Sequence, residues 1–135
     1  MRMTAAACVG ALIVVGVSAP APARATTETI TGKVVDLFCY DPATGANAGM
    51  DHKAAGAAMQ EGRECAWACV KWEGQPVGLL TADGKLYQLA GPIIADNNAK
   101  LAPHVTHTVK ITGDVAEKDG ILTLTATDLT MVAKE

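Results

Sequence analysis

The sequence predicts a small, mainly β domain with one helical insertion. Stretches rich in β-branched residues alternate between apolar and polar positions, as half-buried strands do. Two Asp-Gly pairs, at 83–84 and 119–120, mark tight hairpin turns. Between about residues 50 and 73 the composition changes to Ala, Met, Gln, Glu and Lys, which favour helix. The resulting order of elements predicts a five-stranded OB-like Greek-key barrel with a helical insertion after the first strand.

The first predicted strand covers Thr29–Tyr40. Its apolar alternation slips near Gly32, which indicates a bend or bulge that lets one strand serve two sheets. A loop rich in Pro, Gly and Asn follows. Asp51 then caps a predicted helix over His52–Glu61, and a second helix is expected over about Glu64–Lys71.

The second half of the chain contains the remaining strands. Val77–Thr81 and Lys85–Leu89 are expected to form the first hairpin. A short helix is expected over Asp96–Ala102, before Pro103. Thr106–Val115 alternates cleanly, and Ile121–Val132 reads as a last strand whose phase shifts before Leu129, which indicates a second bulge.

The N-terminus has the features of a secretion signal. Arg2 precedes an uncharged apolar run over Cys8–Val17, and Ala23-Arg24-Ala25 supplies the small residues of a cleavage site. The run is shorter than the roughly 20 residues that span a bilayer. We therefore expect residues 1–25 to be a signal peptide. Residues 26–135 are expected to be a single OB-like domain, periplasmic or secreted, with no membrane anchor after cleavage.

Charge narrows the classes of partner. Loss of the two signal-peptide arginines leaves nine basic and 14 acidic side chains, a net charge of −5 for residues 26–135. Binding to nucleic acid relies on clustered Lys and Arg. Because the predicted domain is acidic and has no basic cluster, no nucleic-acid partner is expected. The sequence also carries no G-x-S-x-G, H-E-x-x-H or phosphate-binding glycine motif, so no enzyme class is predicted.

The cysteines indicate the most specific chemistry. Three remain after signal cleavage, and with one histidine they form the pattern C-x12-H-x12-C-x3-C, made of Cys39, His52, Cys65 and Cys69. Residues four apart on a helix have Cβ atoms about 5–6 Å apart. A disulfide needs about 3.8 Å, so the helical pair suits a chelate better than a mutual disulfide. We expect a Cys3His site for Zn or Cu, structural or for envelope metal handling.

Two other interpretations of the cysteines remain open. Cys39 could pair with Cys65 or Cys69 in a disulfide that staples the insertion to the barrel of a binding module without metal. A thiol-disulfide oxidoreductase is a third possibility, although C-x-x-x-C differs from the C-x-x-C spacing that tunes thiol reactivity. An envelope protein partner is compatible with all three interpretations.

Other side chains near the cysteines are candidates for donors or for packing around the site. Met50 and Met59 are soft neighbours for Cu(I), although such methionines more often fill helices. Asp36 could orient a ligand, but a single carboxylate at the end of a strand is usually solvated. His104 and His107 are expected to be solvated turn residues. Trp67 and Trp72, which flank the cysteine pair, are expected to shield the site by packing.

Several segments together resemble a group of small secreted bacterial proteins of unknown function. They are Gly32-Lys33-Val34-Val35-Asp36-Leu37 with Cys39-Tyr40, Cys65-Ala66 with Cys69, and Pro76-Val77-Gly78-Leu79-Leu80-Thr81 with Asp83-Gly84. The likeness covers about Gly32 to Thr130. It implies an exported OB-like domain with a site centred on cysteines, and it implies no activity.

Overall fold

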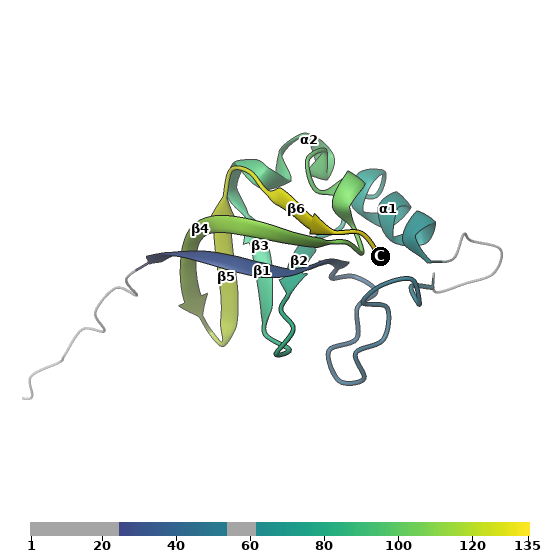
Figure 1. The fold of residues 1–135 in the computed structure, drawn as a ribbon, viewed down its shortest axis with the longest axis horizontal. Coiled ribbons are helices and arrows are strands. Elements are labelled where there is room, and N and C mark those ends of the chain that lie inside the picture. The colour runs from purple at the N-terminus through teal and green to yellow at the C-terminus, as the bar shows by residue number, and fades with distance from the viewer. Residues whose placement is uncertain (1–24, 54–61) are drawn as a thin grey trace, which may run out of the picture.

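The fold is a closed five-stranded β-barrel with one extra strand and two short helices, which confirms the predicted fold class (Figure 1). The computed structural model describes residues 25–53 and 62–135. The elements in chain order are β1 (Thr26–Asp36), α1 (Arg63–Lys71), β2 (Val77–Leu80), β3 (Leu86–Ala90), η1 (Gly91–Ile94), α2 (Ala95–Asn98), η2 (Ala102–His104), β4 (Thr108–Lys118), β5 (Ile121–Ala126) and β6 (Thr130–Ala133). No helix among the described residues is long and apolar enough to cross a membrane.

Strand β1 closes the barrel by pairing with two partners. Its residues 26–33 run antiparallel to β4, and its residues 33–36 run antiparallel to β2. At the change of partner, a Cβ atom on Gly32 would lie 2.7 Å from the carbonyl oxygen of Leu80. The change of partner expected near Gly32 is therefore present, and glycine is needed there because a side chain would meet the Leu80 backbone.

The last predicted strand is divided into two. Strand β5 pairs with residues 113–118 of β4, and β6 pairs with residues 108–110 of the same strand. The break at residues 127–129 falls where the sequence indicated a phase shift before Leu129. Strand β3 completes the barrel by running parallel to β5.

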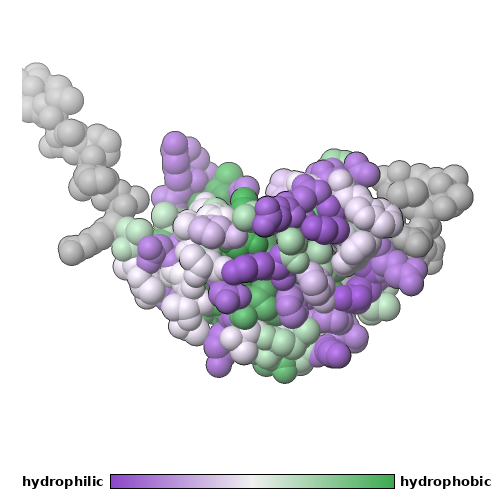
Figure 2. All heavy atoms as spheres, turned by 90° about the horizontal axis from the view of Figure 1, so that it is seen from above, coloured by the Kyte–Doolittle hydropathy of each residue, from purple (hydrophilic) through white to green (hydrophobic). Residues whose placement is uncertain are grey.

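The core fills the barrel with branched apolar side chains from the strands, and α1 covers it from one side. Val34, Leu79, Ile111 and Leu124 are fully buried, and Ala66 and Val70 of α1 join the same cluster. The face that carries β6, α1 and α2 is mostly polar, with apolar side chains visible in a band near its middle (Figure 2). Helix α1 is thus fixed to the barrel by its apolar side.

Two predicted helices differ from the structure. His52 and Lys53 are not helical, and residues 54–61 of the helix expected over His52–Glu61 lie outside the described residues. The helix expected over Asp96–Ala102 is replaced by a left-handed turn, with φ of 53°, 56° and 57° at Asp96, Asn97 and Asn98. Asn and Asp tolerate this conformation better than other L-residues, and both Asn side chains here form hydrogen bonds to the end of α1.

Candidate metal centre

The site begins where β1 ends. Asp36 is the last residue of β1 and pairs with Val77 of β2. Its Oδ1 accepts a hydrogen bond of 2.9 Å from the backbone N–H of Phe38, and its carbonyl accepts one of 2.9 Å from Tyr40. This Asx-type turn folds the chain back on itself. As a result Cys39, which was expected within the strand, lies in a turn beside the Asp36 carboxylate.

The loop after Cys39 returns the chain to the same place. The Asn47 side chain donates a hydrogen bond of 2.9 Å to the carbonyl of Cys39 and accepts one of 2.9 Å from the backbone N–H of Lys53. The carboxylate of Asp51 accepts backbone N–H groups of Asn47 and Gly49, and the bond from Gly49 is the main reason that the Asp51 pKa lies below its ordinary value. The loop is therefore closed by its own polar side chains.

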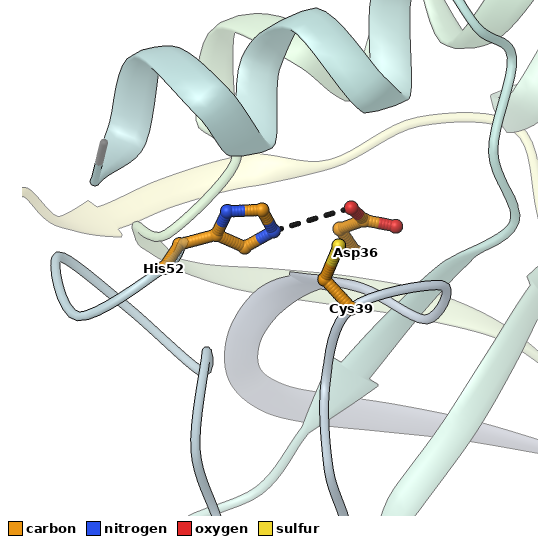
Figure 3. A group of neighbouring side chains, drawn as sticks. All are labelled: Asp36, Cys39 and His52. Atoms are coloured by element: carbon orange, nitrogen blue, oxygen red, sulfur yellow. Dashed lines mark hydrogen bonds and ion pairs between the residues drawn. The ribbon is translucent and has the colours of Figure 1, made fainter. Parts of the chain in front are cut away.

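Asp36, Cys39 and His52 converge on one point (Figure 3). One donor atom from each lies within 4.8 Å of the other two. His52 Nε2 is 3.2 Å from Asp36 Oδ2, and the two side chains are 1% and 0% exposed. The other ring nitrogen, Nδ1, is buried and has no hydrogen-bond partner among the described residues. The three side chains thus form a buried polar cluster with an unused donor atom.

Helix α1 carries the two remaining cysteines to the same region. Cys65 is buried and Cys69 is half-buried. Burial is the main cause that raises the pKa of the Cys69 thiol to about 12, followed by the charge of Asp36 and the thiols of Cys39 and Cys65. Burial also raises the pKa of Cys39 and Cys65, and the Asp36 charge adds to both shifts. All three thiols therefore lie close enough to Asp36 to be affected by its charge.

None of the three described cysteines forms a disulfide. Their raised pKa values favour the protonated thiol, which is a poor nucleophile. Although Cys39, His52 and Asp36 are the residue types of a cysteine-based triad, Cys39 lacks the lowered pKa that activates such a nucleophile. Metal binding also needs the thiolate, so these pKa shifts oppose it as well unless a cation nearby offsets them.

The Asp36, Cys39 and His52 group could hold a metal ion. Bonds of about 2.0–2.3 Å to N, O and S place neighbouring donors of a tetrahedral Zn(II) about 3.3–3.8 Å apart. The 3.2 Å separation of His52 Nε2 and Asp36 Oδ2 is just below that range. A bound cation would also stabilise thiolates beside the Asp36 carboxylate, because its positive charge offsets the repulsion between these negative groups.

The four residues of the predicted Cys3His pattern do not all belong to the compact group. The structure places Cys39 and His52 in it and leaves Cys65 and Cys69 outside it, although the charge of Asp36 adds to the raised pKa of both thiols. The residue that sequence reasoning missed is Asp36, which is 1% exposed and not solvated. A signal was available, because an aspartate that ends a strand three residues before a cysteine suits an Asx turn.

Other expectations about nearby residues are partly wrong. Met50 is 56% exposed, and Met59 lies outside the described residues. Trp67 packs against the core, whereas Trp72 is 66% exposed and meets Trp67 edge-to-face at 5.0 Å. His107 is buried rather than solvated, and its ring accepts a hydrogen bond of 3.2 Å from the backbone N–H of Glu135.

Comparison with known proteins found no matching family model, no matching curated protein and no matching solved structure. The function must therefore be argued from the fold and the site.

Proposed function

We propose that this chain is an exported domain that binds a soft or borderline metal ion at the end of its first strand. The proposed ligands are Cys39, His52 and Cys69, and either Cys65 or the Asp36 carboxylate supplies the fourth donor of a tetrahedral ion. The observation that carries the proposal is the convergence of Asp36, Cys39 and His52 within 4.8 Å of one another in a buried position.

The chemistry of the donors favours Zn(II) over Cu(I). Thiolate and imidazole suit both ions, but a carboxylate oxygen is a hard ligand that Cu(I) does not favour. Met50, the soft donor that would favour copper, is exposed rather than turned into the cluster. Zinc is therefore the first ion to test, and copper is the second.

The proposed setting of the site is the bacterial envelope or the medium. The signal features of residues 1–25 and the resemblance of residues 32–130 to small secreted bacterial proteins support this location. Cys39 and Cys69 are half-buried, whereas Cys65 is buried. The proposed ion is either structural or cargo in envelope metal handling.

The test is a metal titration of residues 26–135, purified with reduced thiols. Co(II) replaces Zn(II) in such sites, and thiolate-to-cobalt charge-transfer absorption reports how many cysteines are bound. Wild type should bind one Co(II) with strong thiolate absorption, and Zn(II) should displace it. Cys39→Ser and His52→Gln should weaken binding, whereas His104→Gln, a matched histidine change outside the cluster, should not.

Thiol counting on the same sample separates the main alternative. The proximity of the three thiols favours a disulfide-stapled module as the second candidate. Protein purified from its native compartment would then show one free thiol before reduction, three after it, and no bound metal. Three free thiols without any affinity for Co(II), Zn(II) or Cu(I) would refute both proposals.

A further inference from the structure

A left-handed turn holds the end of helix α1. Asp96, Asn97 and Asn98 have φ values of 53°, 56° and 57°, which L-residues adopt rarely and seldom in succession. Backbone in this region persists only where surrounding contacts hold it, and such segments gather at functional sites. The contacts of these three residues therefore indicate what the turn is for.

Asn98 holds the chain immediately after Cys69. Its side chain is buried, and Nδ2 donates hydrogen bonds of 2.9 Å to the carbonyl of Val70 and 3.1 Å to the carbonyl of Gln75. The backbone N–H of Gln75 in turn donates a bond of 3.1 Å to the carbonyl of Cys69. The Asn98 side-chain amide thus contacts Val70, the residue after Cys69, directly. It is also linked to Cys69 itself through Gln75.

The other two residues of the turn hold the last turn of the same helix. Asn97 Nδ2 donates to the carbonyl of Lys71 and, at 3.4 Å, to that of Trp72. The Lys71 ammonium donates a bond of 3.1 Å to the carbonyl of Asp96. The last carbonyls of a helix have no partner within the helix, so these side chains act as its C-terminal cap.

We propose that the Asp96–Asn98 turn is a positioning element for the metal centre, because it fixes the last turn of α1 and with it the place of Cys69. This inference rests on the proposed function. The cap is supplied from a distant part of the chain, so the orientation of Cys69 depends on Asn98 and Asn97. Neither asparagine is itself a ligand.

The principal test replaces Asn98 with Asp, which keeps the shape of the side chain and removes both N–H donors. Partners that orient metal ligands typically contribute 10- to 100-fold to affinity. We expect Asn98→Asp to weaken Co(II) binding by about that factor and to reduce thiolate-to-cobalt absorption, because Cys69 is lost from the ion. Wild-type affinity and absorption in a folded Asn98→Asp protein would overturn the proposal.

Two further variants separate positioning from simple destabilisation. Asn97→Gly removes the bonds to Lys71 and Trp72 while glycine keeps the left-handed backbone at no steric cost. It should also reduce thiolate absorption, and it serves if Asn98→Asp does not fold. Asp119→Gly is the control, because Asp119 has a φ of 53° in the β4–β5 hairpin, outside the contacts of α1. It should leave the cobalt spectrum unchanged.

A metal-free measurement separates this inference from the proposed function. In a Cys65→Ser background, dibromobimane becomes fluorescent only when it links Cys39 to Cys69. Asn98→Asp should slow this cross-linking severalfold in folded protein without metal. If wild type binds no metal but the cross-linking slows, the proposed function fails and the positioning role stands. An unchanged cross-linking rate would refute the positioning role whatever the metal result.

Discussion

Replacing His52 with Leu should unfold the domain at a much lower temperature. The Asp36 carboxylate is fully buried, and His52 is the one basic side chain within ion-pair distance among the residues that the structure describes. Removal of one partner from a buried pair leaves a charge without compensation. Within the described part of the chain, the Asp36 carboxylate then keeps the hydrogen bond from the backbone N–H of Phe38 alone.

The magnitude follows from the burial of the pair. A hydrogen bond to a buried charged group is worth about 1.5–3 kcal/mol, and breaking a buried pair costs about 3–5 kcal/mol. We take about 3 kcal/mol, because leucine recovers part of the loss through its apolar surface. An unfolding entropy of about 2.1 cal/mol/K per residue over roughly 110 residues gives about 0.23 kcal/mol/K, so Tm should fall by about 13 °C.

The assay is thermal and urea unfolding of metal-free protein at pH 7, followed by circular dichroism. His52→Gln, whose amide can still donate to Asp36, should lose less than half as much stability. In the double variant Asp36→Asn/His52→Leu, the combined loss should be smaller than the sum of the single losses by at least about 1 kcal/mol, because a neutral amide does not need a charged partner. Additive losses, or a His52→Leu protein as stable as wild type, would refute the reasoning.

Three further predictions concern pH, the loop and the barrel. Burial raises the pKa of the Cys69 thiol from 9.0 to about 12. The contribution of this thiol to the free energy of unfolding is therefore complete below about pH 9 and is lost as the pH rises toward 12. Urea unfolding should show that the difference in stability between wild type and Cys69→Ala shrinks across that range. Asn47→Ala removes the side chain that joins Cys39 to Lys53 by hydrogen bonds. Co(II) titration should show an affinity reduced about 10- to 100-fold. Asn47→Asp keeps the acceptor for the Lys53 N–H and should lose less affinity. Gly32→Ala places a methyl group 2.7 Å from the Leu80 carbonyl, and urea unfolding should show a loss of roughly 1–3 kcal/mol. Gly49→Ala meets only the flexible end of the Glu135 side chain and should lose less.

The barrel could be predicted because its signals are local. Asp83-Gly84 and Asp119-Gly120 each need backbone that few other pairs adopt, and they fix the β2–β3 and β4–β5 hairpins. Gly32 indicated the bend of β1, and the change of phase before Leu129 indicated the break between β5 and β6. Each of these features depends on residues that are neighbours in the sequence, so a short stretch of sequence is enough to predict it.

The missed features depend on contacts between distant parts of the chain. Asp36 is buried because His52, sixteen residues later, folds back onto it. The left-handed turn at Asn97 and Asn98 exists because those amides bind carbonyls at the end of α1, more than twenty residues earlier. Neither partner could be found from local pattern, which in the second case favoured an ordinary helix.

The dual pairing of β1 ties occupancy of the site to the opening of the whole barrel. The same strand forms ladders with β2 and β4 and supplies Asp36 at its end. An ion that binds only the folded state lowers the population of every globally opened form by the factor 1 + [L]/Kd. Amide protons of Val34 and Val35 should then exchange with deuterium more slowly in metal-bound protein. A chelator that removes the ion should restore the faster exchange, although it contacts no hydrogen bond of the barrel.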